Sequence, residues 1–117
     1  WNGQRICTTE TVRRAIQQFG SLQIDRTMMI PMRFSAGLML GGDPVGIWGP
    51  HSREAFGHVG LINKFCWADA SRDISVSLLN TGLPIVGHHL PALGKFVWTI
   101  CRHCPKLPRT EWPLVAA

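Results

Sequence analysis

Residues 56–80 read FGHVGLINKFCWADASRDISVSLLN, and this stretch decides the fold. Its last part, residues 74–80, alternates apolar and polar side chains, which is typical of a strand with one buried face. Two more strands are expected at residues 56–61 and 64–68, followed by a turn at residues 69–73. Connections this short predict antiparallel hairpins rather than parallel strands joined by helices.

The clearest helical pattern lies upstream, at residues 9–19. Thr8 or Thr9 can cap the start of this helix, and Gly20 can close its end. Apolar side chains recur at spacings of three and four, with arginine and glutamine on the other side. The pattern predicts a surface helix with one buried stripe, made of Val12, Ala15, Ile16 and Phe19.

The segment between this helix and residue 56 has weaker patterns. Residues 23–26 read as a polar turn, and residues 32–40 read as a strand. Gly37 within that strand suggests a bulge or a close approach of the backbone. Residues 41–52 are rich in glycine and proline and have few periodic apolar positions, which predicts a loop.

A second helix is expected to begin near Leu90, with Pro91 in its first turn, where proline is tolerated. One apolar stripe follows at helical spacing, made of Leu90, Leu93, Val97, Ile100 and Cys104. Pro105 and Pro108 end the helix, and the tail is expected to be loose. Together these elements predict an α+β fold, an antiparallel sheet with flanking helices, in one incomplete domain (residues 1–104) with a Pro-rich tail (residues 105–117).

Composition and charge exclude some functions. The net charge is +5, but the basic residues are scattered and form no reading motif, so no nucleic-acid partner is expected. No membrane span is expected, because Lys95 interrupts the most apolar run, residues 90–100. The chain starts at Trp1 without a signal peptide, which suggests a processed or truncated start and leaves the compartment unknown.

The cysteines do not indicate a metal or cofactor. Cys101 and Cys104 form a Cys-x-x-Cys at a helix end, whereas a thioredoxin-like motif lies at a helix start. A zinc site would need a second well-spaced pair, and His88 and His89 are adjacent. Cys66 lies within an expected strand, where a thiol acts as a small hydrophobe. We therefore predict no metal and no cofactor.

The phrase Phe56-Gly57-His58-Val59-Gly60 resembles the third active-site motif of β-lactamase-related serine hydrolases. That motif is Lys-Thr-Gly in the penicillin-targeting members and commonly His-x-Gly in the esterase-like branch. Trp67-Ala68-Asp69, a hairpin and an apolar strand ending in Asn80 follow in the family's order. The resemblance extends over roughly residues 8–83. It implies the C-terminal portion of a β-lactamase/transpeptidase-like fold.

The resemblance implies acyl transfer to water through an acyl-serine. In this family the nucleophile is the Ser of a Ser-x-x-Lys motif, helped by that Lys and by a Tyr. This chain contains no Tyr, and none of its serines is followed three residues later by Lys. The chain alone is therefore predicted to be inactive, with the nucleophile upstream of Trp1 or lost. The substrate would be a small ester or amide, and His-x-Gly favours esters.

The resemblance also assigns roles to individual residues. His58 would stand where penicillin-targeting members have Lys, and Gly60 would let a substrate approach the backbone. The backbone N–H of Leu61 would be one of two oxyanion-hole donors. Val59 and Ile62 would line the substrate site.

Two departures from the family keep other interpretations open. Ala70 stands where the family often has Pro, and residues 61–63 are bulky where it often has small residues. One alternative is a non-catalytic binding or structural module, and another is an unrelated α+β domain with a chance match. A truncated sheet would leave a face or an edge open, which favours self-association.

Overall fold

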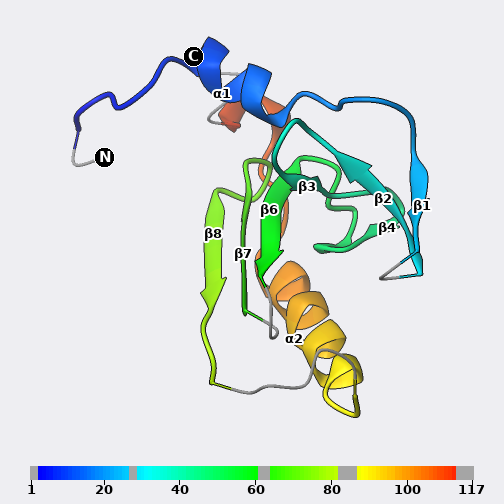
Figure 1. Cartoon of the computed structure of the whole chain (residues 1–117). Helices are drawn as coiled ribbons and strands as arrows, with labels where there is room; N and C mark the ends of the chain where they lie inside the picture. Colours follow the sequence, from blue (N-terminus) through cyan, green and yellow to red (C-terminus); the bar gives the residue numbers. More distant parts are fainter. Residues whose placement is uncertain (1–2, 27–28, 61–63, 82–86, 113–117) are drawn as a thin grey trace.

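The computed structural model describes residues 3–26, 29–60, 64–81 and 87–112 (Figure 1). The elements in chain order are α1 (Thr9–Ile16), β1 (Gln23–Asp25), β2 (Ile30–Phe34), β3 (Met39–Leu40), β4 (Val45–Gly46), β5 (Gly49–Pro50), β6 (Ala55–Gly60), β7 (Lys64–Asp69), β8 (Ile74–Leu78), α2 (Leu90–His103) and the 3-10 turn η1 (Arg109–Glu111). The predicted α+β class with an antiparallel sheet is confirmed.

Six of the strands form one sheet in the order β1-β2-β3-β6-β7-β8, and every neighbouring pair is antiparallel. The hairpins β6–β7 and β7–β8 follow the alternation read from the sequence. Strands β4 and β5 pair separately as a small ribbon. Short connections thus produce a meander, as expected from the spacing of turn residues.

The two faces of β6–β8 differ in burial because successive side chains point to opposite sides. The packed face carries apolar residues of β6, β7 and β8, among them Ala55, Phe65 and Val76. The open face carries the alternate residues, which are half-buried or exposed. The open face consists of Phe56, His58, Gly60, Lys64, Cys66, Ala68, Ser75 and Ser77.

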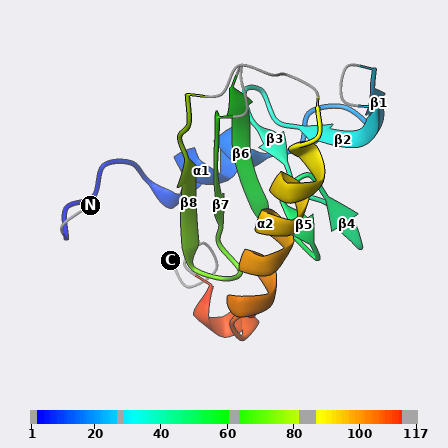
Figure 2. The ribbon, with the colours of Figure 1, turned by 90° about the horizontal axis from the view of Figure 1, so that it is seen from below.

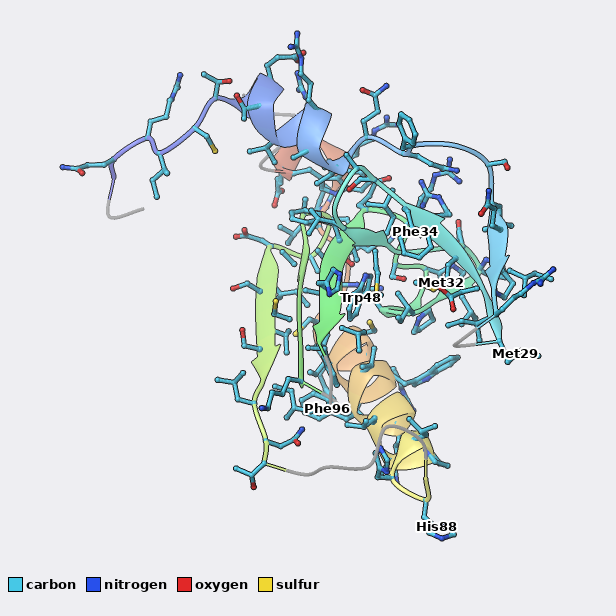
Figure 3. The ribbon with its side chains drawn as sticks, in the orientation of Figure 1. Met29, Met32, Phe34, Trp48, His88 and Phe96 are labelled. Carbon is cyan, nitrogen blue, oxygen red and sulfur yellow. The ribbon has the colours of Figure 1, made fainter. Side chains whose placement is uncertain are left out.

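Helix α2 lies over the packed face, as Figure 2 shows from below. Its Val97 joins a buried cluster with Trp48, Ala55, Phe65 and Trp67. The rings of Trp48 and Trp67 stack at 5.6 Å between centroids with 10° between their planes. Trp48 lies beside β6 (Figure 3) and donates its indole N–H to the Met39 carbonyl at 2.9 Å, so its polar atom is satisfied inside the core.

Gly57 is required by the packing of β6 against β7. A Cβ at this position would overlap the Cys66 carbonyl oxygen and lie 2.6 Å from the Cα of Trp67. No heavy side chain fits without moving the strands apart. The first glycine of the Phe-Gly-His-x-Gly phrase is therefore structural in this chain.

A buried ion pair fastens the β7–β8 turn to the end of α2. Asp69 accepts from Ser71 N and Ser71 Oγ and pairs with Arg72 Nε at 3.0 Å. Arg72 also donates to the carbonyl oxygens of Cys101, in the last turn of α2, of Cys104, its C-cap residue, and of Pro50. Carbonyl groups at a helix C-terminus have no partner within the helix, and a guanidinium with several donors satisfies them.

Helix α1 is shorter and less buried than predicted. Thr8 caps it by accepting from Thr11 N, as expected, but the helix ends at Ile16, because Gln17 is extended and Phe19 N donates to the Phe34 carbonyl at 2.8 Å. The whole of α1 lies in the described part of the chain, and none of its side chains is buried. The prediction of a buried stripe was wrong: Val12 and Ile16 are half-buried, and Ala15 and Phe19 are exposed.

Three further predictions between the helices were wrong. The loop expected at residues 41–52 contains strands β4 and β5, which pair with each other. Residues 23–25 form strand β1, which pairs with β2, rather than a turn. Residues 32–40 form two strands, β2 and β3, joined by a turn in which Ser35 Oγ accepts from Leu38 N at 3.0 Å. Gly37 lies in that turn and makes no bulge. The reversal at Ser35 interrupts what reads as one apolar strand.

The C-terminal third follows the predicted helix but not the predicted tail. Helix α2 begins at Leu90 with proline in its first turn, although Cys101 rather than Cys104 is its buried cysteine. The tail is attached to the domain as far as Trp112. Leu107 N donates to the Ser71 carbonyl at 2.8 Å, and Trp112 Nε1 donates to the Leu107 carbonyl.

Candidate functional site

His58 and Gly60 lie on the open face of β6, where the alternation placed them. The His58 side chain is exposed, and its Nδ1 lies 2.8 Å from the Val59 carbonyl oxygen. A carbonyl can only accept, so Nδ1 carries the proton. In the neutral ring Nε2 is then the hydrogen-bond acceptor.

The strand register places Cys66 and Ser77 beside His58. His58 is the partner of Cys66 in the β6–β7 hairpin, and Cys66 is the partner of Ser77 in the β7–β8 hairpin. An imidazole, a thiol and a hydroxyl therefore form one row across three strands, all exposed. The prediction that Cys66 packs as a small hydrophobe was wrong. The alternation of β7 indicates that Cys66 is exposed, because its neighbours Phe65 and Trp67 occupy the packed face.

The remaining predicted site residues do not all join this row. Val59 points to the packed face and contacts the buried cluster, away from His58 and Gly60. Gly60 pairs with Lys64, and a Cβ on Gly60 would lie 3.3 Å from the Lys64 carbonyl oxygen. Leu61 and Ile62, the predicted oxyanion donor and substrate contact, lie outside the described residues.

A shallow hollow of about 280 Å³ adjoins the same face. It lies between Phe56 on β6, Ala68 on β7 and Ser75 on β8, at the end of β6 opposite to Gly60. Its walls are mostly apolar with a few hydroxyl and carboxylate groups. The open face thus offers room beside the row but holds no deep pocket formed by these residues.

The loop before β6 has the residue types of a catalytic triad without its geometry. His51 Nδ1 lies 2.7 Å from Asp43 Oδ1, and Ser52 follows in sequence. Ser52 is fully buried, however, and its Oγ donates to the Gly49 carbonyl at 2.8 Å. A hydroxyl committed in this way is not available as a nucleophile, so these three residues shape the loop.

In the Cys-x-x-Cys pair, Cys101 is buried, Cys104 is half-buried, and neither is in a disulfide. Cys101 is buried against Gly49 and Val97, and its thiol contacts the Trp48 carbonyl oxygen at 3.3 Å. Burial raises the pKa of Cys101, which disfavours the reactive thiolate. Within residues 3–26, 29–60, 64–81 and 87–112, no group of three or more potential ligands is placed to hold a metal ion.

Neither described helix has the length and apolar composition needed to cross a membrane. The chain matches no protein-family model, and neither the curated proteins nor the solved structures include a match to it.

Proposed function

We propose that this chain is the C-terminal part of a β-lactamase-related serine hydrolase that cleaves small esters through an acyl-serine. The observation that carries the proposal is the open face of β6. An exposed histidine and an exposed glycine alternate on one strand, in the middle of a six-stranded sheet. A wall of this kind needs a second part of the protein opposite it to form a closed site.

The hairpins around this strand support the proposal. The phrase around His58 leads into β7 with Trp67-Ala68-Asp69, then a turn, then the apolar strand β8. Within this arrangement Gly57 and Asp69 have structural reasons of their own, in strand packing and in the pair with Arg72. His58 has no such reason among the described residues, because its side chain is exposed and its one hydrogen bond to them is with the next residue's carbonyl.

His58 would contact the bound ester as a polar group of the site wall. Its Nδ1–H is held by the Val59 carbonyl, which leaves Nε2 as the atom that can contact a substrate. Nε2 can accept a hydrogen bond from a substrate or, when protonated, place a positive charge near the developing oxyanion. The acyl-enzyme would form on a serine outside these 117 residues, and water would release the acid.

A second candidate function is a non-catalytic binding or structural module. The observation that favours it is the composition of the chain, which has no Tyr and no Ser-x-x-Lys. Ala70 and the bulky residues 61–63 also depart from the hydrolase pattern. In this case the open face would bind a partner and catalyse no reaction.

The coding sequence upstream of Trp1 tests the proposal. We expect an in-frame extension that encodes Ser-x-x-Lys and a later Tyr. A start codon near Trp1, or an extension without those residues, would favour the non-catalytic module. The 117-residue chain itself should remain unlabelled by a fluorophosphonate probe. Labelling that is lost on unfolding would place a nucleophile within this chain and overturn the assignment.

A further inference from the structure

The edge of the sheet at β8 has features that the proposed hydrolase site does not use. Strand β8 is the last strand in the order, and in the described part of the chain no strand pairs with its outer side. An edge strand presents a row of backbone donors and acceptors to any chain that can pair with it. Proteins usually protect such an edge with charge, proline or a bulge. The sequence of β8, ISVSL, contains no charged residue and no proline.

The packed face near β8 is only partly covered. Ile74, Val76 and Leu78 are half-buried, and they form the apolar stripe of β8. Helix α2 contacts β5 and lies over β6 rather than over β8, as seen from below in Figure 2. Val76 and Leu78 contact the buried cluster on their inner side, and none of the described elements covers the outer flank of the stripe.

We propose that β8 is a self-complementary interface that pairs antiparallel with β8 of a second copy of this chain. A two-fold axis perpendicular to the sheet at Val76 places Ile74 opposite Leu78 of the second copy, and Ser75 opposite Ser77. Apolar residues then meet apolar residues on the packed face, and hydroxyls meet hydroxyls on the open face.

This register is favoured over its neighbours for a geometric reason. Side chains of both copies must keep the same face, so the register can shift only in steps that preserve the alternation. The register centred on Val76 pairs all five residues of the strand, and any other reduces the overlap. The two α2 helices lie on one side of the joined sheet, away from the axis. The proposal does not depend on His58 or Gly60.

Charged substitutions at Ser75 and Ser77 provide the test. Both are exposed on the open face, and their partners within the chain are Ala68 and Cys66, so either charge is tolerated by the monomer. In S75K/S77K each lysine meets a lysine of the second copy, and in S75E/S77E each glutamate meets a glutamate. A mixture of the two variants pairs opposite charges.

Sedimentation across a dilution series of the 117-residue chain, under reducing conditions, measures the dimer. We expect a concentration-dependent dimer whose Kd rises about tenfold in either double variant and returns toward the wild-type value in the equimolar mixture. The control T99K/T110K adds the same charge at exposed positions on α2 and η1 and should leave Kd unchanged.

A chain that stays monomeric at every concentration would overturn the proposal. So would a dimer that S75K/S77K and S75E/S77E both leave intact, because its interface would lie elsewhere. Protection, in a monomeric sample, of the β8 amide hydrogens that point away from β7 would show that another segment of the same chain covers this edge. Circular dichroism of each variant separates loss of the dimer from loss of the fold.

Discussion

The N-terminal segment (residues 3–34) and the packed unit (residues 39–104) contain similar apolar side chains but bury them differently. In the packed unit, α2 and the sheet enclose aromatic residues such as Trp48, which is 1% exposed. In the N-terminal segment Met32 is the one buried side chain among the described residues. Large apolar side chains are exposed in both regions, and those of the N-terminal segment are Ile6, Phe19, Leu22, Ile24 and Met29.

The difference shows what an amphipathic pattern needs in order to be buried. Helix α2 faces a sheet whose neighbouring strands supply Phe65 and Trp67, so Val97 becomes buried. Helix α1 lies beyond the start of β6 (Figure 1), and no layer formed by the described residues buries its side chains. Exposed apolar surface of this extent is typical of an interaction surface. It supports the proposal that the chain is part of a larger protein.

The largest difference in free energy of unfolding should appear when one aromatic residue is replaced in each region. Trp48→Ala removes a stacked indole and a buried hydrogen bond, and we expect the free energy of unfolding to fall by about 3–5 kcal/mol. Phe19→Ala removes a ring that is 80% exposed, and the change should stay within about 0.5 kcal/mol. Urea unfolding followed by circular dichroism measures both. Equal losses would show that the N-terminal segment is packed as tightly as the rest.

A smaller difference in free energy of unfolding should appear when one arginine is replaced in each region. Arg72→Ala leaves the Asp69 carboxylate buried without its partner and frees the carbonyl groups at the end of α2, so we expect a loss of about 3 kcal/mol at pH 7. Arg14→Ala breaks an exposed i,i+4 pair with Glu10 and should cost no more than about 0.5 kcal/mol.

The same unfolding measurement distinguishes these outcomes. A small effect of Arg72→Ala would mean that water reaches Asp69 once the guanidinium is removed. In that case the turn would not fasten α2 to the sheet, and the packed unit would be less cooperative than its contacts indicate.

Within the packed unit, the sequence predicted β6, β7, β8 and α2 well because their signals are local. Alternation in residues 74–78 and the short turn before them define the β7–β8 hairpin, and Pro91 marks the first turn of α2. The placement of His58 and Gly60 on one face follows from the same alternation. These features depend on neighbours in the chain and require no knowledge of the tertiary fold.

The predictions for the N-terminal segment failed where tertiary contacts determine the bounds and burial of its elements. Nothing local indicates that Phe19 N donates to the Phe34 carbonyl and so ends α1 early, or that the strand breaks after Phe34. Helical periodicity showed an apolar stripe but not whether a layer covers it. The exposure of Cys66 was predictable from the strand period, whereas its place beside His58 requires the register.

Ester turnover by the product of the complete reading frame tests the central claim most directly. We predict that this protein hydrolyses a p-nitrophenyl ester and that His58→Ala lowers kcat/KM about tenfold or more, since it removes the polar group beside the developing oxyanion. His88→Ala, an exposed histidine near the start of α2 and far from β6 (Figure 3), should change nothing. A protein without turnover, or a His58→Ala variant with unchanged kcat/KM, would contradict the account.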